Sequence, residues 1–203
     1  MVDIILIGPI SNSHVNPAVT LGVLIRESGE ERSEGKTSSN VVFAQLIMLA
    51  QVVGAALGAC LIALLRENTK YGVDVGMARL CGGIGGPNCD GVNGNGPRML
   101  LAEIIGTFLF VNVNVNIIFN NGSKDIILNA VIIGIALTLG LMVAAPISGA
   151  SINPAVGLVL PIFQHVVHDL SMAQIWIHFL GPLIGGGLAG LFQLSYKSSL
   201  AKM

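Results

Sequence analysis

The clearest chemistry in this sequence lies in two triplets, Asn16–Pro17–Ala18 and Asn153–Pro154–Ala155. Asparagine is a preferred N-cap, and proline at the first helical position loses no hydrogen bond, because the N–H at that position has no partner within the helix. A small alanine follows in both cases. Each triplet therefore predicts a helix start, whose free backbone N–H groups can donate hydrogen bonds to a polar group.

Composition places these helix starts in a membrane. Apolar residues make up 53% of the 203 residues, charged residues only 10%, and there are 26 glycines, which does not describe a soluble domain. Segments of roughly 20 apolar residues can cross a hydrocarbon core of about 30 Å, and four qualify: residues 41–65, 99–119, 126–145 and 175–194. Only the second contains a charge, Glu103. We expect an all-α, multi-pass integral membrane protein surrounded by lipid.

The apolar runs behind the two triplets are too short to span. Residues 17–25 and 154–163 would form only about 14 Å of helix, so we expect two half-helices that dip into the bilayer. Backbone N–H groups at their buried ends are tolerated only where they line a polar cavity. If the half-helices enter from opposite faces, their positive ends meet near the midplane, as in inverted-repeat transport proteins.

The segments around the triplets also match each other in sequence, which indicates an internal repeat. Beyond the shared Asn-Pro-Ala-Val, they match at Ile10/Ile147, Ser11/Ser148, Leu21/Leu158 and Ile25/Ile162. Glycines four residues apart follow in both repeats, Gly54 and Gly58 in the first and Gly181 and Gly185 in the second, a spacing that lets helix backbones approach closely. We expect one membrane domain over 1–203, with a partial first repeat (1–65), a long connecting loop (66–98) and a second repeat (99–203).

The loops, the cysteines, the N-terminal residues and the net charge suggest no further function. We expect a charged, solvated loop at 26–40 and a tight turn at 120–125. Cys81 and Cys89 in the long loop could form a disulfide or remain free thiols. No cleaved signal is evident in "MVDIILIGPI". A net charge of −1 without a basic cluster gives no support to nucleic-acid binding.

An enzyme is not expected. The sequence offers no metal-ligand cluster and no nucleophile–base set, and we interpret His165 and His168 as solvated rather than as ligands. Neither a metal nor another cofactor is expected.

Five stretches, "HVNPAVTLG", "AQVVGAALGA", "AEIIGTFLFV", "SGASINPA" and "GPLIGGGLAGL", resemble, in their order, signatures of the aquaporin and aquaglyceroporin family, the major intrinsic proteins. The resemblance covers nearly the whole chain apart from its loops. It implies an aquaporin-like inverted-repeat bundle with two re-entrant half-helices, a narrow pore for water or small neutral solutes, and usually a homotetramer. It also implies that Asn16 and Asn153 offer amide donors to a passing oxygen and that their helix dipoles disfavour protons and cations.

Two further residues have counterparts in the family. His14 resembles a pore-lining histidine, the alternative being a solvated loop histidine near the membrane surface. Glu103 resembles the buried glutamate that hydrogen-bonds a re-entrant loop. The physical case for Glu103 is independent, because an ionisable group within a span is costly unless it faces a polar partner.

The chain departs from the family pattern in two ways. The family has six full spans and this chain has four, because the first two family helices are missing and residues 2–10 supply at most the end of the second. Half-helix backbone would then face lipid, so either partners close the wall or the chain is a fragment. At the constriction, Val156 stands where the family usually places arginine, Leu141 where water-selective members carry histidine, and Ala150 at a small loop position. An apolar ring of this kind predicts altered selectivity.

The stretch "VNVNVN" places three asparagines in a membrane span. On a helix Asn112 and Asn116 share a face and Asn114 points away, so at least one is expected to find a partner other than the pore. Hydrogen bonds between subunits and packing within the bundle both remain open for Asn112 and Asn116. From the missing helices and these asparagines we expect a chain that is stable only beside another protein.

Two functions are compatible with the sequence. The first is an aquaporin-like channel for water or small neutral solutes with altered selectivity. The second is a non-conducting, aquaporin-like structural subunit of a larger membrane complex. The intact Asn-Pro-Ala pair favours the channel, whereas the missing helices and the lost arginine favour the subunit.

Overall fold

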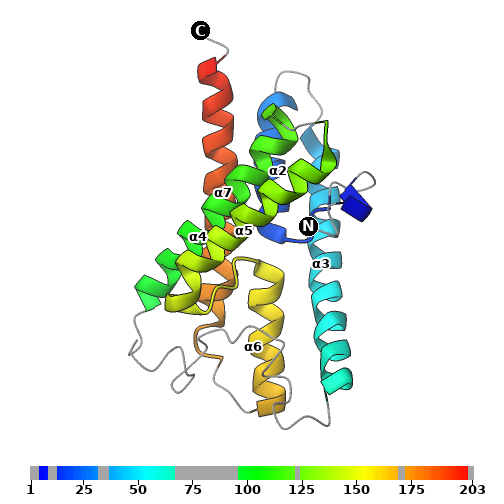
Figure 1. Cartoon of the computed structure of the whole chain (residues 1–203), viewed down its shortest axis with the longest axis vertical. Helices are drawn as coiled ribbons and strands as arrows, with labels where there is room; N and C mark the ends of the chain where they lie inside the picture. The colour runs from blue at the N-terminus through cyan, green and yellow to red at the C-terminus, as the bar shows by residue number, and fades with distance from the viewer. Residues whose placement is uncertain are drawn as a thin grey trace.

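The computed structural model describes residues 5–8, 13–31, 37–66, 96–121, 124–168 and 172–200, and every regular element in these ranges is a helix (Figure 1). Within them, four helices are long and apolar enough to cross a membrane: α3 (Thr37–Arg66), α4 (Gly96–Asn116), α5 (Ile126–Ser148) and α7 (Ile175–Leu200). The predicted all-α, multi-pass membrane fold is therefore confirmed. The expectations for Cys81, Cys89 and most of the connecting loop fall outside the described residues.

The ends of α5 illustrate how local sequence sets the elements. Helix α4 continues into a π-helical turn, η2 (Ile117–Asn121). The carboxylate of Asp125 then caps α5 by accepting the backbone N–H groups of Ile127 and Leu128. At the other end Gly149 adopts φ 87°, a left-handed conformation that glycine reaches without strain, and turns the chain into the second re-entrant loop.

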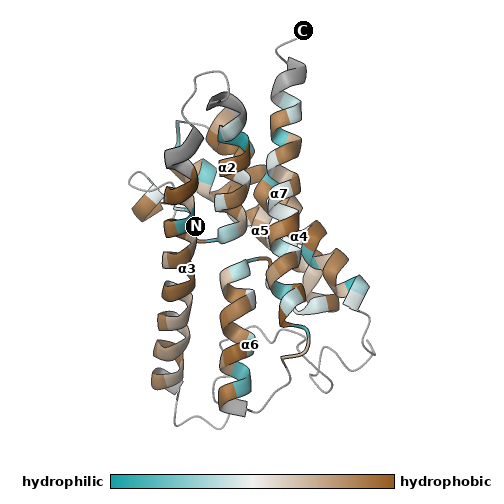
Figure 2. Cartoon of the chain, turned by 180° about the vertical axis from the view of Figure 1, so that it is seen from behind, coloured by the Kyte–Doolittle hydropathy of each residue, from teal (hydrophilic) through white to brown (hydrophobic). Residues whose placement is uncertain are grey.

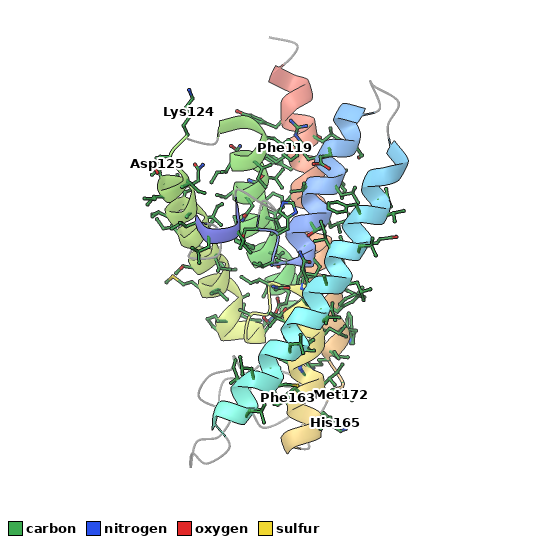
Figure 3. All side chains as sticks on the ribbon, turned by 90° about the vertical axis from the view of Figure 1, so that its right-hand side faces the viewer. Phe119, Lys124, Asp125, Phe163, His165 and Met172 are labelled. Atoms are coloured by element: carbon green, nitrogen blue, oxygen red, sulfur yellow. The ribbon has the colours of Figure 1, made fainter. Side chains whose placement is uncertain are left out.

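The two half-helices, α2 (Pro17–Glu31) and α6 (Pro154–His168), run from the middle of the bundle to opposite ends. The guanidinium of Arg26, in α2, lies 4.9 Å from the ring centroid of Phe119. Figure 3 places Phe119 toward one end of the bundle and His165, in α6, toward the other. The half-helices thus enter from opposite sides, which is the inverted arrangement predicted from the repeat.

The prediction of a charged loop over residues 26–40 is wrong at both ends of that range, where the structure has helix. Helix α2 continues to Glu31 and α3 begins at Thr37. Arg26 is only 1% exposed, and its guanidinium lies over the Phe119 ring. Helix α6 likewise extends beyond residue 163 to His168.

Close backbone contacts through glycine join α7 to α4 and α4 to α5. An added Cβ on Gly181 would lie 2.7 Å from Cβ of Glu103, and one on Gly185 would lie 2.5 Å from the carbonyl oxygen of Ile104. Gly106 and Gly140 face each other in the same way, because a Cβ on either would lie within 2.7 Å of the other's carbonyl oxygen. The close approach predicted for Gly181 and Gly185 is therefore confirmed.

Helix α3 lacks the equivalent contacts. An added Cβ at Gly54 or Gly58 would meet no atom within 4 Å, so the close approach predicted there is wrong for the described residues. Only 6% of the most apolar stretch of α3 is buried, against 44% for α4 and for α7. Figure 2 shows α3 standing at the side of the bundle, hydrophobic along much of its length. One broad apolar face of the molecule therefore has no partner among the described helices.

The asparagines of α4 have partners within the chain. Oδ1 of Asn112 accepts from Nε2 of Gln193 on α7 at 2.8 Å, and the buried Asn114 donates to the carbonyl of Phe110 one turn back at 2.9 Å. Asn116 also has a hydrogen-bond or other polar partner. The expectation of a partner other than the pore is therefore confirmed for Asn112, whose bond to Gln193 joins α4 to α7. Contacts of these asparagines with another subunit stay a prediction.

Candidate functional site: the junction of the two half-helices

The N-terminal ends of α2 and α6 meet in the middle of the bundle. Nδ2 of Asn16 donates to the carbonyl oxygen of Ile152 at 2.9 Å, and Nδ2 of Asn153 donates to the carbonyl oxygen of Val15 at 3.2 Å. The two bonds are related by the repeat, because each runs from an asparagine to the residue that precedes the other asparagine. Residues far apart in sequence thus form one junction.

Each asparagine also caps its own helix. Oδ1 of Asn16 accepts from the backbone N–H of Ala18 at 2.8 Å, and Oδ1 of Asn153 accepts from that of Ala155 at 3.0 Å. The amide orientations are consequently fixed, with the oxygen on the helix and the nitrogen on the opposite loop. Each Nδ2 carries a second N–H that these bonds do not use.

A cavity of about 510 Å³ opens beside this junction. It lies between α3 and the start of α6, and the loop before α2 forms part of its wall. Its lining is mostly apolar: His14, Val15, Ile47, Ala50, Gln51, Gly54, Ala55, Asn153, Ala155 and Val156. Asn153 brings its amide to this cavity, whereas Asn16 is only 4% exposed and does not line it.

The first re-entrant loop is held by α3. Nε2 of Gln51 donates to the carbonyl oxygen of His14 and to Oγ1 of Thr20, the latter at 3.0 Å. Nε2 of His14 and Oε1 of Gln51 are buried without a hydrogen-bond partner in the described residues. Both residues line the cavity, but these two atoms are buried behind its surface.

The second re-entrant loop is held by the carboxylate of Glu103, which is fully buried. Its Oε1 accepts from Oγ of Ser148 at 2.7 Å and from the backbone N–H of Ser151 at 2.9 Å. Its Oε2 accepts from Oγ of Ser151 and from the backbone N–H of Ile152, both at 2.9 Å. Four donors from the end of α5 and the loop after it thus converge on one charge, which satisfies the requirement that a buried carboxylate be fully hydrogen-bonded.

Both loops contain residues with positive φ. Ser13 (φ 51°) and Ala150 (φ 58°) occupy the same repeat position, three residues before the asparagine, and Ile152 has φ 35°. A β-branched residue with positive φ is strained. The hydrogen bond from the Ile152 N–H to Glu103 helps to hold this conformation.

Sequence reasoning missed His178. This residue is 0% exposed on α7, and its Nδ1 lies 3.0 Å from Oε1 of Glu103. Its carbonyl oxygen accepts from Oγ of Ser151 at 3.1 Å. A histidine within an apolar span was the available signal, because an ionisable group at that depth requires a partner.

The structure brings some of the predicted site residues together and leaves others apart. His14, Asn153, Ala155 and Val156 line the cavity. Pro17, Ala18 and Pro154 are buried in the helix starts behind it. Leu141, on α5, and Ala150 are not among the lining residues, so a constriction that includes them stays a prediction. Among the described residues no group of three or more His, Cys, Asp or Glu side chains is placed to hold a metal ion.

Comparisons with known proteins agree with this architecture. The family model described as "Major intrinsic protein" matches residues 1–193. The chain is 31% identical over 184 residues to the probable aquaporin TIP2-2 of Oryza sativa subsp. japonica, covering 90% of the chain and 61% of that protein. It is 30% identical over 202 residues to aquaporin AqpM of Methanothermobacter marburgensis (91% and 68%), and 28% identical over 199 residues to aquaporin-5 of Sus scrofa (96% and 65%).

The chain spans about three fifths of the length of several of these curated relatives. The family match nevertheless extends over nearly all of it, and the paired half-helices lie within the matched residues. The chain is therefore a member of the major intrinsic protein family and an integral membrane protein with several transmembrane helices.

Proposed function

We propose that this chain forms the conducting part of a channel for small neutral solutes. The observation that carries the proposal is the junction of the two half-helices, where Asn153 presents its amide to a cavity of about 510 Å³. A solute with a hydroxyl or carbonyl oxygen could accept the N–H of Asn153 that the junction leaves unused. The aquaporin names of the relatives support the same function.

The electrostatics of the junction favour neutral solutes. Two helix N-termini point at the same region, and each carries a partial positive charge equivalent to roughly half an elementary charge. A cation or proton would be repelled by both positive ends and would incur a large desolvation cost in an apolar cavity. A neutral solute is not repelled, and its desolvation costs far less. The channel should therefore exclude cations.

We further propose that the selectivity differs from that of a water channel. Val156 lines the cavity directly behind the second Asn-Pro-Ala triplet, where a fixed cation and donor would otherwise replace the hydration of water. An apolar wall favours solutes that are larger or less polar than water. Leu141 and Ala150 are expected to contribute to the same constriction.

A complete pore requires further helices beside α3. Its apolar face is largely exposed, with Leu46, Leu49, Val53 and Leu57 each more than half exposed. We propose that residues 1–203 form one membrane domain. We also propose that another protein segment covers the apolar face of α3: a further copy of this chain in a homotetramer, another membrane subunit, or a further part of a longer gene product. The same exposed face supports the second candidate function, a non-conducting structural subunit of a larger membrane complex.

Stopped-flow measurements on vesicles separate these candidates. Protein extracted in its native assembly and the purified single chain should be compared for water, glycerol and potassium permeability. The channel proposal expects glycerol permeability above that of empty vesicles for the assembly, none for potassium, and little conduction by the single chain because its wall is incomplete. An assembly that conducts neither glycerol nor water would favour the structural subunit.

A further inference from the structure

The second re-entrant loop is fixed from two directions. Of the five donors that reach the Glu103 carboxylate, four come from residues 148–152, which are the last residue of α5 and the loop after it. The fifth is Nδ1 of His178 on α7, 3.0 Å from Oε1. His178 is therefore the contact that ties the carboxylate of Glu103, on α4, to α7.

His178 is the repeat counterpart of Gln51. Each of these residues lies three positions before the first glycine of a pair spaced four apart, Gly54 in α3 and Gly181 in α7. Gln51 donates directly to the carbonyl of His14, two residues before Asn16. The carbonyl of His178 accepts from Ser151, two residues before Asn153. The same position thus contacts the same part of the re-entrant loop in both repeats.

The surroundings leave His178 little freedom. It is fully buried, and a Cβ added to Gly157 of α6 would overlap its carbonyl group. Because a carboxylate can only accept hydrogen bonds, Nδ1 of His178 must carry the proton in this contact. The ring orientation, the tautomer and the plane of the Glu103 carboxylate are therefore set together.

We propose that His178 is a positioning residue for the cavity: by donating from Nδ1 to Glu103 it fixes the carboxylate that holds Ser151 and Ile152, and through them the amide of Asn153. This inference rests on the proposed function, because it concerns the loop that presents Asn153 to a solute. His178 itself does not line the cavity. Its effect passes through Glu103 and the loop backbone.

The test is backbone amide exchange measured by NMR on the full chain in nanodiscs. His178→Phe keeps a ring but removes the donor, and should raise the exchange rates of the Ser151 and Ile152 amides by about tenfold or more, because hydrogen bonds to charged groups are stronger than neutral ones. His178→Asn keeps an N–H near the position of Nδ1 and should restore rates to within about threefold of the original protein. Trp176→Phe, an exposed change on the same helix, is the control and should alter neither amide.

Unchanged exchange in His178→Phe would overturn the proposal, as would equal exchange in the Phe and Asn variants, since ring shape rather than the donor would then matter. If His178→Phe does not fold, the ¹⁵N shift of His178 in the unaltered protein decides: a protonated Nδ1 supports the proposal and an unprotonated Nδ1 overturns it. Glycerol permeability of the same samples separates the two claims. If His178→Phe raises the amide exchange rates but the unaltered protein does not conduct glycerol, only the proposed function is contradicted. If the unaltered protein conducts glycerol but His178→Phe leaves the exchange rates unchanged, only the role of His178 is contradicted.

Discussion

The side-chain amide of Asn16 donates to the backbone carbonyl of Ile152, 2.9 Å away, in the other repeat. This bond, with its counterpart from Asn153 to Val15, makes each re-entrant loop a partner of the other. The two half-helices are consequently fixed end to end, although α2 and α6 lie in segments joined by a long connection. The cavity lies beside this junction, because Asn153 and Val15 both line it.

Replacing the buried carboxylate should weaken the fold. Glu103→Gln exchanges one acceptor oxygen for an NH₂ group that would face donors, and we expect a loss of about 3–5 kcal/mol, the cost of leaving a buried charged network incomplete. Thermal unfolding in detergent measures the effect. Asp125→Asn is the matched control, because asparagine also caps a helix and the site is exposed, so the melting temperature should hardly change. Equal stability of both variants with the original protein would contradict the role of Glu103.

Two glycine-to-alanine substitutions should differ sharply in their effect on stability. Gly157→Ala places a Cβ against the carbonyl of His178, and we expect a destabilisation of about 1–3 kcal/mol or more because α6 and α7 must move apart. A Cβ at Gly54 meets no atom within 4 Å, so Gly54→Ala should not destabilise the single chain and, as a change within a helix, should stabilise it by up to about 1 kcal/mol. Unfolding of both purified variants, monitored by circular dichroism, provides the comparison. In the native assembly, Gly54→Ala should become destabilising if another helix covers α3. Equal effects of the two substitutions on the stability of the single chain would contradict the packing of α6 against α7.

The asparagines of α4 should stabilise the chain rather than its assembly. Asn112→Leu removes the bond to Gln193 and should lower the free energy of unfolding by about 1 kcal/mol, the usual size of a hydrogen bond between helices in a membrane. Asn114→Leu loses only a bond within α4 and should cost less. Native mass measurement should find the same oligomeric state in both variants. A change of oligomeric state without a change in stability would instead support contacts between subunits.

A cation at the cavity wall should alter selectivity. Val156→Arg would add charge and donors behind the second triplet, and we expect glycerol permeability of the native assembly to fall by roughly an order of magnitude. Val156→Ala keeps the wall apolar and should leave glycerol permeability near its original value. Stopped-flow light scattering gives both rates. If the arginine variant conducts glycerol as well as the alanine variant does, Val156 does not contribute to the constriction.

Local patterns predicted the elements that position the junction. The two triplets predicted helix starts because asparagine and proline have defined positions at an N-terminus, and the repeat predicted that the starts would meet. The single charge among the spans singled out Glu103 because an isolated ionisable group in a membrane needs partners. These inferences required no knowledge of distant contacts.

Other features depended on contacts that the sequence pattern does not carry. Arg26 looked like a loop residue because the ring of Phe119 that covers it is far away in sequence. Gly54 and Gly58 share the spacing of Gly181 and Gly185, yet only the latter pair has a helix against it in the described residues. His178 was overlooked because histidine was not counted with the charged residues of the spans. Nothing in the sequence indicated that Gln193 was the partner of Asn112.

The proposed conduction of small neutral solutes at the junction of the half-helices depends on the side chain of Asn153, which lines the cavity. Asn153→Leu removes the amide from the cavity. It should still fold, because the lost N-cap costs about 1 kcal/mol and the lost hydrogen bond to the Val15 carbonyl costs about 1 kcal/mol more; circular dichroism checks this. Stopped-flow light scattering of vesicles carrying the native assembly should show glycerol permeability for the original protein and a return to the level of empty vesicles for the variant. Conduction through this junction would be contradicted if the original protein and the variant both gave the glycerol permeability of empty vesicles, or if both conducted glycerol equally well.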